Sequence, residues 1–340
     1  MNVLYLSGSG EHRHDYGAAF LFDGLVEVLG FDNVRDFPEN PTYHLSGPHS
    51  RDSCELDADL FYPTRGSSSF SNKFELRERL MGMPDETVAV IAVSFPLDAH
   101  IAQEISDICA VLHPSIPIMA VDYSDIVKNM RQHYELLAGR PLAAYFKREL
   151  PHGADWGYPL PLSYPASRVG ALDFEAKKPI VMYHATDHGG GLPGIPRRLI
   201  VSQLCRDLDD DQLDVALYPG QEKGSRPSPE EYNERKRRAL VGVSWNGAIN
   251  WDCSRFWNNF AFGVAQVAEY PRIQIPHMPE HGEHCIYVRN PEDVVAPVQV
   301  LVDNPAYARE MAKAGHEYFL KWHCSRARAE YLLDIVKKVA

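Results

Sequence analysis

The fold of this chain is decided by one stretch, VGVSWNG (residues 241–247) followed by AINWDCSRFWNNFAFGVAQVAEY (residues 248–270). The first part is a short apolar run that breaks at Asn246-Gly247. An Asn-Gly pair favours positive φ and therefore a tight turn, so the run is predicted to be a β-strand that ends there.

A helix and a second strand are predicted after the turn. Phe256, Phe260 and Val264 recur at helical spacing, and Gly263 is placed to end the helix as its C-terminal cap residue. The apolar run that follows, residues 264–268, is typical of another strand. Strand, polar turn, helix and strand form the unit that places ligands at the carboxyl ends of parallel strands.

The rest of the chain repeats this organisation in two series. Apolar runs typical of buried strands alternate with amphipathic segments in residues 1–150 and again in residues 179–324. A Pro-rich linker, residues 151–178, separates the two series, and an amphipathic helix, residues 325–340, follows the second. The sequence therefore predicts an α/β fold with two doubly wound domains.

Composition and charge exclude several classes of protein. The chain has 340 residues, enough for two domains, and a net charge of −12 from 34 basic and 46 acidic residues. Binding to nucleic acid or anionic membrane needs basic surface, so this charge argues against bulk binding of either. The 6 cysteines form no C-x-x-C pair, which argues against a zinc site or a disulfide framework. Neither a signal peptide nor an apolar run of ~18 residues is found, so we expect a cytoplasmic protein.

Several motifs occur in a characteristic order in the second half. EEYN (230–233) precedes the deciding strand, the pair Arg255-Phe256 follows the turn, and GEHCIYVRNPEDV (282–294) and AGHEYFLKWH (314–323) come later. This order resembles the C-terminal half of glycosyltransferases of the spore-maturation (CgeB-like) type. YFKREL (145–150), followed by PLPLSYP, resembles the domain-joining segment of the same enzymes.

The resemblance covers roughly residues 140 to 335 and implies a GT-B architecture. Two Rossmann-like domains would face each other across a cleft, with the acceptor on the first domain and a nucleotide sugar on the second. The final helix, residues 325–340, would pack back on the first domain. The donor would be a nucleotide-diphosphate sugar, with a UDP-sugar expected, and no further cofactor. The activity would be that of a hexosyl- or pentosyltransferase.

Transfer from such a donor requires that the departing diphosphate be stabilised, by a divalent metal or by Arg and Lys side chains with helix N-termini. The sequence shows no Asp-x-Asp motif at a strand end, so we expect metal-independent binding and no metal site. Arg255, with the turn Asn246-Gly247, and Arg197 are the candidate diphosphate ligands. For Arg255 the alternative is a salt bridge between domains.

Three further residues are candidates on the donor side. His184 ends a predicted strand and either faces the donor or is a hydrogen-bonded core histidine. Glu283 either approaches the sugar or ribose or is a solvated loop carboxylate. Asn258 occupies the position at which the CgeB-like enzymes usually carry a Glu that holds the ribose of the donor. An amide can hydrogen-bond a hydroxyl but brings no charge.

Candidate catalytic residues follow the first strand, which ends in Ser7-Gly8-Ser9-Gly10. His12, His14 and Asp15 could supply the base that an inverting transferase needs, and the alternative is a polar surface turn. Such closely spaced side chains lack the scaffold of a metal site.

Two functions of different class remain. The first is transfer of a sugar to an unidentified acceptor, which could be a glycan, a protein, a small molecule or a modified nucleobase. The second is a non-catalytic nucleotide- or sugar-binding module that acts as a regulator or partner, a reading that Asn258 favours. A nicotinamide-dependent oxidoreductase is excluded, because no G-x-G-x-x-G follows the first strand with an acidic residue ~20 positions later.

Overall fold

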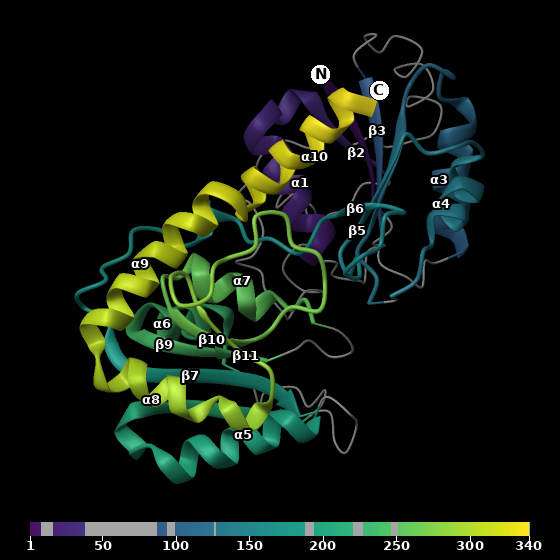
Figure 1. Cartoon of the computed structure of the whole chain (residues 1–340). Coiled ribbons are helices and arrows are strands. Elements are labelled where there is room, and N and C mark those ends of the chain that lie inside the picture. Colours follow the sequence, from purple (N-terminus) through teal and green to yellow (C-terminus); the bar gives the residue numbers. More distant parts are fainter. Residues whose placement is uncertain are drawn as a thin grey trace. The chain divides into compact units, whose positions relative to one another are not determined.

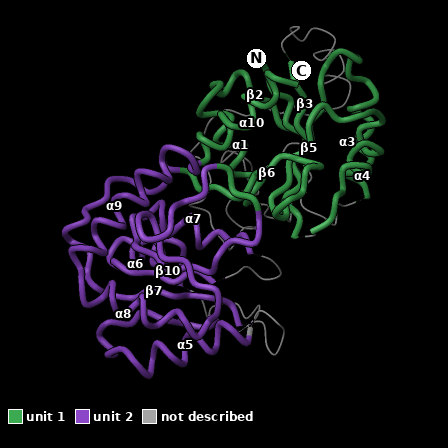
Figure 2. The backbone as a smooth tube through the Cα atoms, in the orientation of Figure 1, with its two compact units in different colours: residues 1–165, 274–276, 325–340 green, residues 166–273, 277–324 purple. Residues whose placement is uncertain are grey.

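The computed structural model describes residues 1–7, 16–37, 87–93, 99–125, 127–187, 194–219, 227–245 and 251–339. They fall into two compact units, shown in green and purple in Figure 2. Unit 1 consists of Met1–Pro165, Gln274–Pro276 and Ser325–Ala340, and unit 2 of Ala166–Ile273 and His277–Cys324. Each unit contains a parallel β-sheet with helices (Figure 1), so the predicted α/β fold is confirmed.

The sheet of unit 1 has the strand order β2-β1-β3-β4-β5-β6, and all of its strand pairs are parallel. Its strands are β1 (Asn2–Ser7), β2 (Val34–Phe37), β3 (Thr87–Val93), β4 (Ile118–Asp122), β5 (Ala144–Lys147) and β6 (Tyr158–Pro159). Every residue of β3 is buried, as its continuous apolar sequence TVAVIAV predicts for a central parallel strand.

The helices of unit 1 include the last one of the chain. They are α1 (Tyr16–Leu29), α3 (Ala99–Val111), α4 (Arg131–Ala138) and α10 (Ser325–Val339). Figure 1 shows α10, in yellow, beside α1, in purple. The two helices approach closely because Gly24 has no side chain: a Cβ there would lie 2.0 Å from the carbonyl oxygen of Ser325.

The sheet of unit 2 has the order β11-β10-β9-β7-β8 and is also parallel. Its strands are β7 (Lys178–Asp187), β8 (Leu213–Pro219), β9 (Ala239–Ser244), β10 (Ala265–Glu269) and β11 (Ile286–Val288). Its helices are α5 (Gly194–Asp207), α6 (Pro229–Arg238), α7 (Ser254–Ala261), α8 (Val295–Asp303) and α9 (Pro305–Trp322). Short 3₁₀ turns in the two units are η1 (Phe31–Asn33), η3 (Ala166–Arg168), η4 (Asp210–Gln212) and η5 (Pro291–Asp293).

The deciding stretch forms β9, α7 and β10, as predicted. Cys253 is the N-cap residue of α7, and Gly263 follows the helix with φ 59°, a conformation that glycine adopts without strain. The preceding helix α6 begins where Ser228 accepts a hydrogen bond from the backbone N–H of Glu231 (3.2 Å).

The segment predicted as a linker is divided between the units at Pro165/Ala166. Gln274 belongs to unit 1 although it lies far along the chain: its N–H donates to the carbonyl of Leu150 (2.8 Å), and its Nε2 to those of Pro151 (2.8 Å) and Ala154 (2.7 Å). These contacts explain why Gln274–Pro276 belongs to unit 1, whereas the residues before and after it in the sequence belong to unit 2.

Both sheets reverse their winding next to their first strand. In unit 2 the chain passes from β7 to β8 on one side and returns to β9 on the other, so the switch point lies between β7 and β9. In unit 1 the corresponding point lies between β1 and β3. Ligands of open parallel sheets bind at the carboxyl ends of the strands at such a point.

Candidate functional site

Arg255 spans the switch point of unit 2. It is the second residue of α7, and its guanidinium donates from Nε to the carbonyl of His184 (2.9 Å) and from Nη1 to the carbonyl of Trp245 (3.2 Å). His184 lies near the end of β7, and Trp245 directly follows β9. One side chain therefore joins the carboxyl ends of the two strands between which a ligand is expected.

The guanidinium of Arg255 contacts backbone carbonyls and an aromatic ring, and no carboxylate among the described residues. Its guanidinium lies over the ring of Tyr183, 5.2 Å from the ring centroid, and no ion pair with it occurs in the part of the chain that the structure describes. Among these residues the salt-bridge alternative thus finds no partner. The side chain is half-buried, so the charge can meet an anion with little competition from water.

Arg197 lies at the same edge of the sheet. It is in the first turn of α5, only 2% exposed, and donates from Nη1 to the carbonyl of Thr186 at the end of β7 (2.8 Å). Burial lowers the pKa of its guanidinium, and the charge of Arg255 lowers it further. Two guanidinium groups close enough to repel each other are an arrangement that a bound dianion would stabilise.

Arg198, the neighbour of Arg197, points elsewhere. It is exposed and forms an ion pair with Asp187 (2.9 Å). Only one of the two adjacent arginines therefore joins Arg255, as the geometry of a helix requires.

His184 contributes its backbone to the site, not its ring. The ring is buried, with Nε2 hydrogen-bonded to Asp214 (2.8 Å) and Nδ1 to the hydroxyl of Tyr218 (2.7 Å). Both ring nitrogens are thus occupied within the protein, which fits the alternative of a hydrogen-bonded core histidine.

Asn258 and Glu283 differ in their surroundings. Asn258 lies in α7 three residues after Arg255, and its Oδ1 is buried with no hydrogen-bond partner among the described residues. Glu283 has a side chain that is 62% exposed and lies 3.7 Å from the Nε2 of His284. The Asn258 amide oxygen is thus a buried acceptor without a partner among the described residues, while Glu283 has the environment of a loop carboxylate.

The remaining candidates of the sequence analysis, His12, His14, Asp15, Asn246 and Gly247, lie outside the described residues. In the sequence, the three catalytic candidates come after β1.

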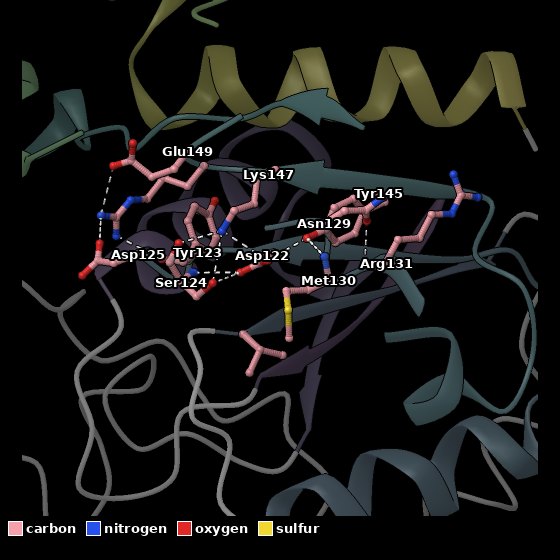
Figure 3. A network of polar contacts seen from close by, with 12 residues as sticks. Asp122, Tyr123, Ser124, Asp125, Asn129, Met130, Arg131, Tyr145, Lys147 and Glu149 are labelled. Carbon is pink, nitrogen blue, oxygen red and sulfur yellow. Dashed lines mark hydrogen bonds and ion pairs between the residues drawn. The ribbon is translucent and has the colours of Figure 1, made fainter. Parts of the chain in front are cut away.

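Unit 1 contains a buried polar network that the sequence analysis did not foresee (Figure 3). At the carboxyl end of β4, Asp122 accepts hydrogen bonds from the hydroxyls of Ser124 and Tyr145, both at 2.6 Å. Lys147, at the end of β5, lies 3.2 Å from Asp122 and donates to the carbonyl of Ser124 (2.7 Å). Burial lowers the pKa of Lys147, whereas the charge of Asp122 favours its protonated form.

The neighbouring Arg148 extends this network. It donates to the carbonyl of Tyr123 (3.0 Å), forms an ion pair with Asp125 and lies 3.5 Å from Glu149. The ring of Tyr123 packs on Gly17 in the first turn of α1, where a Cβ would lie 2.4 Å from it. The network therefore fixes the strand-end segment against which α1 begins. The sequence does contain a signal for this network: two apolar runs end in charged residues, in VDYSD (121–125) and YFKRE (145–149).

Within the described ranges, no group of three or more His, Cys, Asp or Glu side chains is arranged to hold a metal ion. None of the described helices has the length and apolar character needed to span a membrane.

Part of the sequence is similar to a known family. Residues 197–334 match the family described as "Glycosyl transferase-like". No curated protein sequence matches the chain.

Solved glycosyltransferase structures share the fold over the whole chain. An alpha-glucosyltransferase in complex with UDP and a 13-mer DNA has a TM-score of 0.63 at 12% identity, covering 99% of this chain and 100% of that chain. Anabaena Alr3699/HepE in complex with UDP and glucose has a TM-score of 0.59 at 7% identity, covering 99% of each chain. A glycosyltransferase from Rickettsia africae has a TM-score of 0.56 at 8% identity, covering 99% of this chain and 97% of that one. At these identities the likeness concerns the fold. Residues 197–334 are thus similar to a glycosyl transferase-like family, and the chain as a whole shares the GT-B fold of these solved structures.

Proposed function

We propose that this protein is a glycosyltransferase that moves a sugar from a UDP-sugar to an acceptor, with the diphosphate held by Arg255 and Arg197. The observation that carries the proposal is the position of Arg255 across the ends of β7 and β9, with no carboxylate paired to it among the described residues. The UDP in the alpha-glucosyltransferase and HepE structures, which share the fold, supports UDP as the nucleotide.

The two guanidinium groups are oriented by contacts within the protein itself. Each donates to a backbone carbonyl at a strand end, Arg255 to His184 and Trp245, and Arg197 to Thr186. A donor group that is already oriented stabilises developing negative charge without reorganisation at the moment of reaction. Arg255 also lies in the first turn of α7, where the helix dipole favours an anion. Together these groups would stabilise the UDP leaving group as its bond to the sugar breaks.

Asn258 is proposed to accept a hydrogen bond from a ribose hydroxyl. Its buried Oδ1 has no partner in the described part of the chain, and it lies one helical turn from Arg255. A ribose hydroxyl is a neutral donor that an amide oxygen can satisfy. The resemblance to the spore-maturation (CgeB-like) enzymes supports the same placement. Glu283 and the imidazole of His184 have a smaller part in this proposal, because one is exposed and the other is fully hydrogen-bonded.

The donor is proposed to bind without metal, since cationic side chains can meet the diphosphate charge. The base that activates the acceptor is proposed among His12, His14 and Asp15, which follow the first strand of the acceptor-side domain. The acceptor stays open. The alpha-glucosyltransferase structure contains DNA, but the net charge of −12 of this chain disfavours a polyanionic acceptor.

A non-catalytic binding module is the second candidate, and the Asn258 amide is the observation that favours it. Titration calorimetry with UDP in the presence of EDTA tests binding, and release of UDP from a panel of UDP-sugars tests turnover. We expect UDP to bind with the chelator present and at least one UDP-sugar to be consumed. Binding without consumption of any sugar would support the module, and loss of binding in EDTA, restored by manganese, would contradict the metal-independent site.

A further inference from the structure

Tyr183 carries a hydroxyl that the fold alone does not explain. It lies within β7, and its side chain is fully buried among apolar residues of unit 2. The hydroxyl oxygen has no hydrogen-bond partner among the described residues. A buried polar group without a partner destabilises a protein, and phenylalanine would fill the same space without that cost. The hydroxyl therefore calls for a role other than packing.

Tyr183 lies directly beside a residue of the candidate diphosphate site. Its ring supports the guanidinium of Arg255 at 5.2 Å, and the charges of Arg255 and Arg197 both act on the hydroxyl. Cys253, the N-cap residue of α7, and Glu269, the last residue of β10, act on it as well. Residues of α5, α7 and β10 thus all act electrostatically on this hydroxyl.

The hydroxyl keeps its proton at neutral pH. Burial raises the pKa of Tyr183 to about 12, although the charges of Arg255 and Arg197 lower it. A protonated phenol can donate a hydrogen bond to an anion, which an ionised one cannot.

Two other buried unsatisfied groups belong to residues linked to Arg255 by a backbone contact or by one turn of α7. Trp245, whose carbonyl accepts from Arg255, has a buried indole Nε1 without a partner among the described residues, and so has the Oδ1 of Asn258. Unsatisfied buried groups are rare in folded proteins, and proteins tolerate them where a ligand completes the bonding.

We propose that Tyr183 is a donor-site residue: its ring positions Arg255, and its hydroxyl gains a hydrogen-bond acceptor, a phosphate oxygen, when a nucleoside diphosphate binds. This inference rests on the proposed function, because it assigns the diphosphate to Arg255 and Arg197. Hydrogen bonds to charged groups are the strong ones, so this bond would add appreciably to donor affinity.

Tyr183→Phe separates the hydroxyl from the ring, because it keeps the ring under Arg255 and removes only the oxygen. We expect the melting temperature to stay the same or rise, while the affinity for UDP in titration calorimetry falls about tenfold. The affinity for uridine, which lacks phosphate, should not change between wild type and variant. A structural role for the hydroxyl predicts the reverse, a lower melting temperature with UDP affinity intact.

Tyr287→Phe is the matched control. Tyr287 is in the same unit, is 7% exposed, and also has a buried hydroxyl, which lies beside the thiol of Cys285. It should leave UDP affinity unchanged, because the groups that act most on its hydroxyl are Cys285, Tyr270 and Tyr318. Unchanged UDP affinity in Tyr183→Phe, or an equal loss in both variants, would overturn the assignment. Failure of the wild-type protein to bind UDP at all would instead count against the proposed function.

Discussion

Replacement of Lys147 by methionine should strongly destabilise unit 1. Lys147 and Asp122 are both completely buried and lie 3.2 Å apart, so removal of the cation leaves a carboxylate in the interior without its counter-charge. Loss of one partner of a buried pair costs about 3–5 kcal/mol. Lys147→Met also removes the donor to the carbonyl and hydroxyl of Ser124. We therefore expect a loss near the upper end of that range.

Native-state hydrogen exchange measured on peptides that cover β4 and β5 reports this loss within unit 1 itself. The control is Arg326→Met, which breaks an exposed ion pair with Glu330 on α10 and should cost only about 0.3–0.5 kcal/mol. The double variant Asp122→Asn/Lys147→Met removes both charges and should recover much of the loss. A single-variant loss no larger than that of Arg326→Met would refute the reasoning, since Ser124 and Tyr145 alone would then be enough to stabilise the Asp122 carboxylate.

Three further predictions follow from individual contacts. Gly24→Ala should lower the melting temperature of the protein, because the new Cβ would lie 2.0 Å from the carbonyl oxygen of Ser325. The control is Gly139→Ala, at a position with open space, which should show only the strain of its positive φ (66°). Burial raises the pKa of the Cys285 thiol from 9.0 to about 12. The folded protein therefore keeps a proton that the unfolded chain loses above pH 9, and stability should fall as the pH rises through this window. In Cys285→Ala the free energy of unfolding should fall less steeply with pH, and the difference in slope from wild type should be about 1.4 kcal/mol per pH unit. UDP should protect half-buried Cys253, beside Arg255, from alkylation by iodoacetamide, as peptide mass spectrometry would detect, while exposed Cys205 reacts equally with and without UDP. Equal labelling of Cys253 in both conditions would contradict its place at the donor site.

Local sequence signals predicted the elements that position the site. The spacing of Phe256 and Phe260 and the glycine at position 263 predicted α7 and its end, and the structure confirms both. The position of Arg255 at a strand-end crevice followed from the same pattern, because a helix that follows a parallel strand begins at its carboxyl end. These features depend on residues that are neighbours in the sequence.

Contacts between distant parts of the chain could not be predicted in this way. Tyr183 lies in an apolar run that predicts only a buried strand, and its contact with Arg255 joins residues that are far apart in sequence. Likewise Asp122 and Lys147 each end a strand, but only the register of β4 and β5, where they pair directly, brings them together. Gln274, whose partners lie near residue 150, carries no sequence signal of its place in unit 1.

The central claim is that Arg255 binds the diphosphate of the donor, and the affinity of Arg255→Ala for UDP tests it most directly. Loss of one charged hydrogen-bonding contact should cost about 2–3 kcal/mol, or roughly 30- to 150-fold in affinity. Arg255→Lys should recover only part of it, because a lysine cannot hold two oxygens in a planar fork. Arg198→Ala, which removes an exposed arginine paired with Asp187, is the control and should bind UDP normally. Some loss of melting temperature is expected in Arg255→Ala, since the carbonyls of His184 and Trp245 lose their donor. A folded Arg255→Ala protein that binds UDP as tightly as wild type would contradict the account.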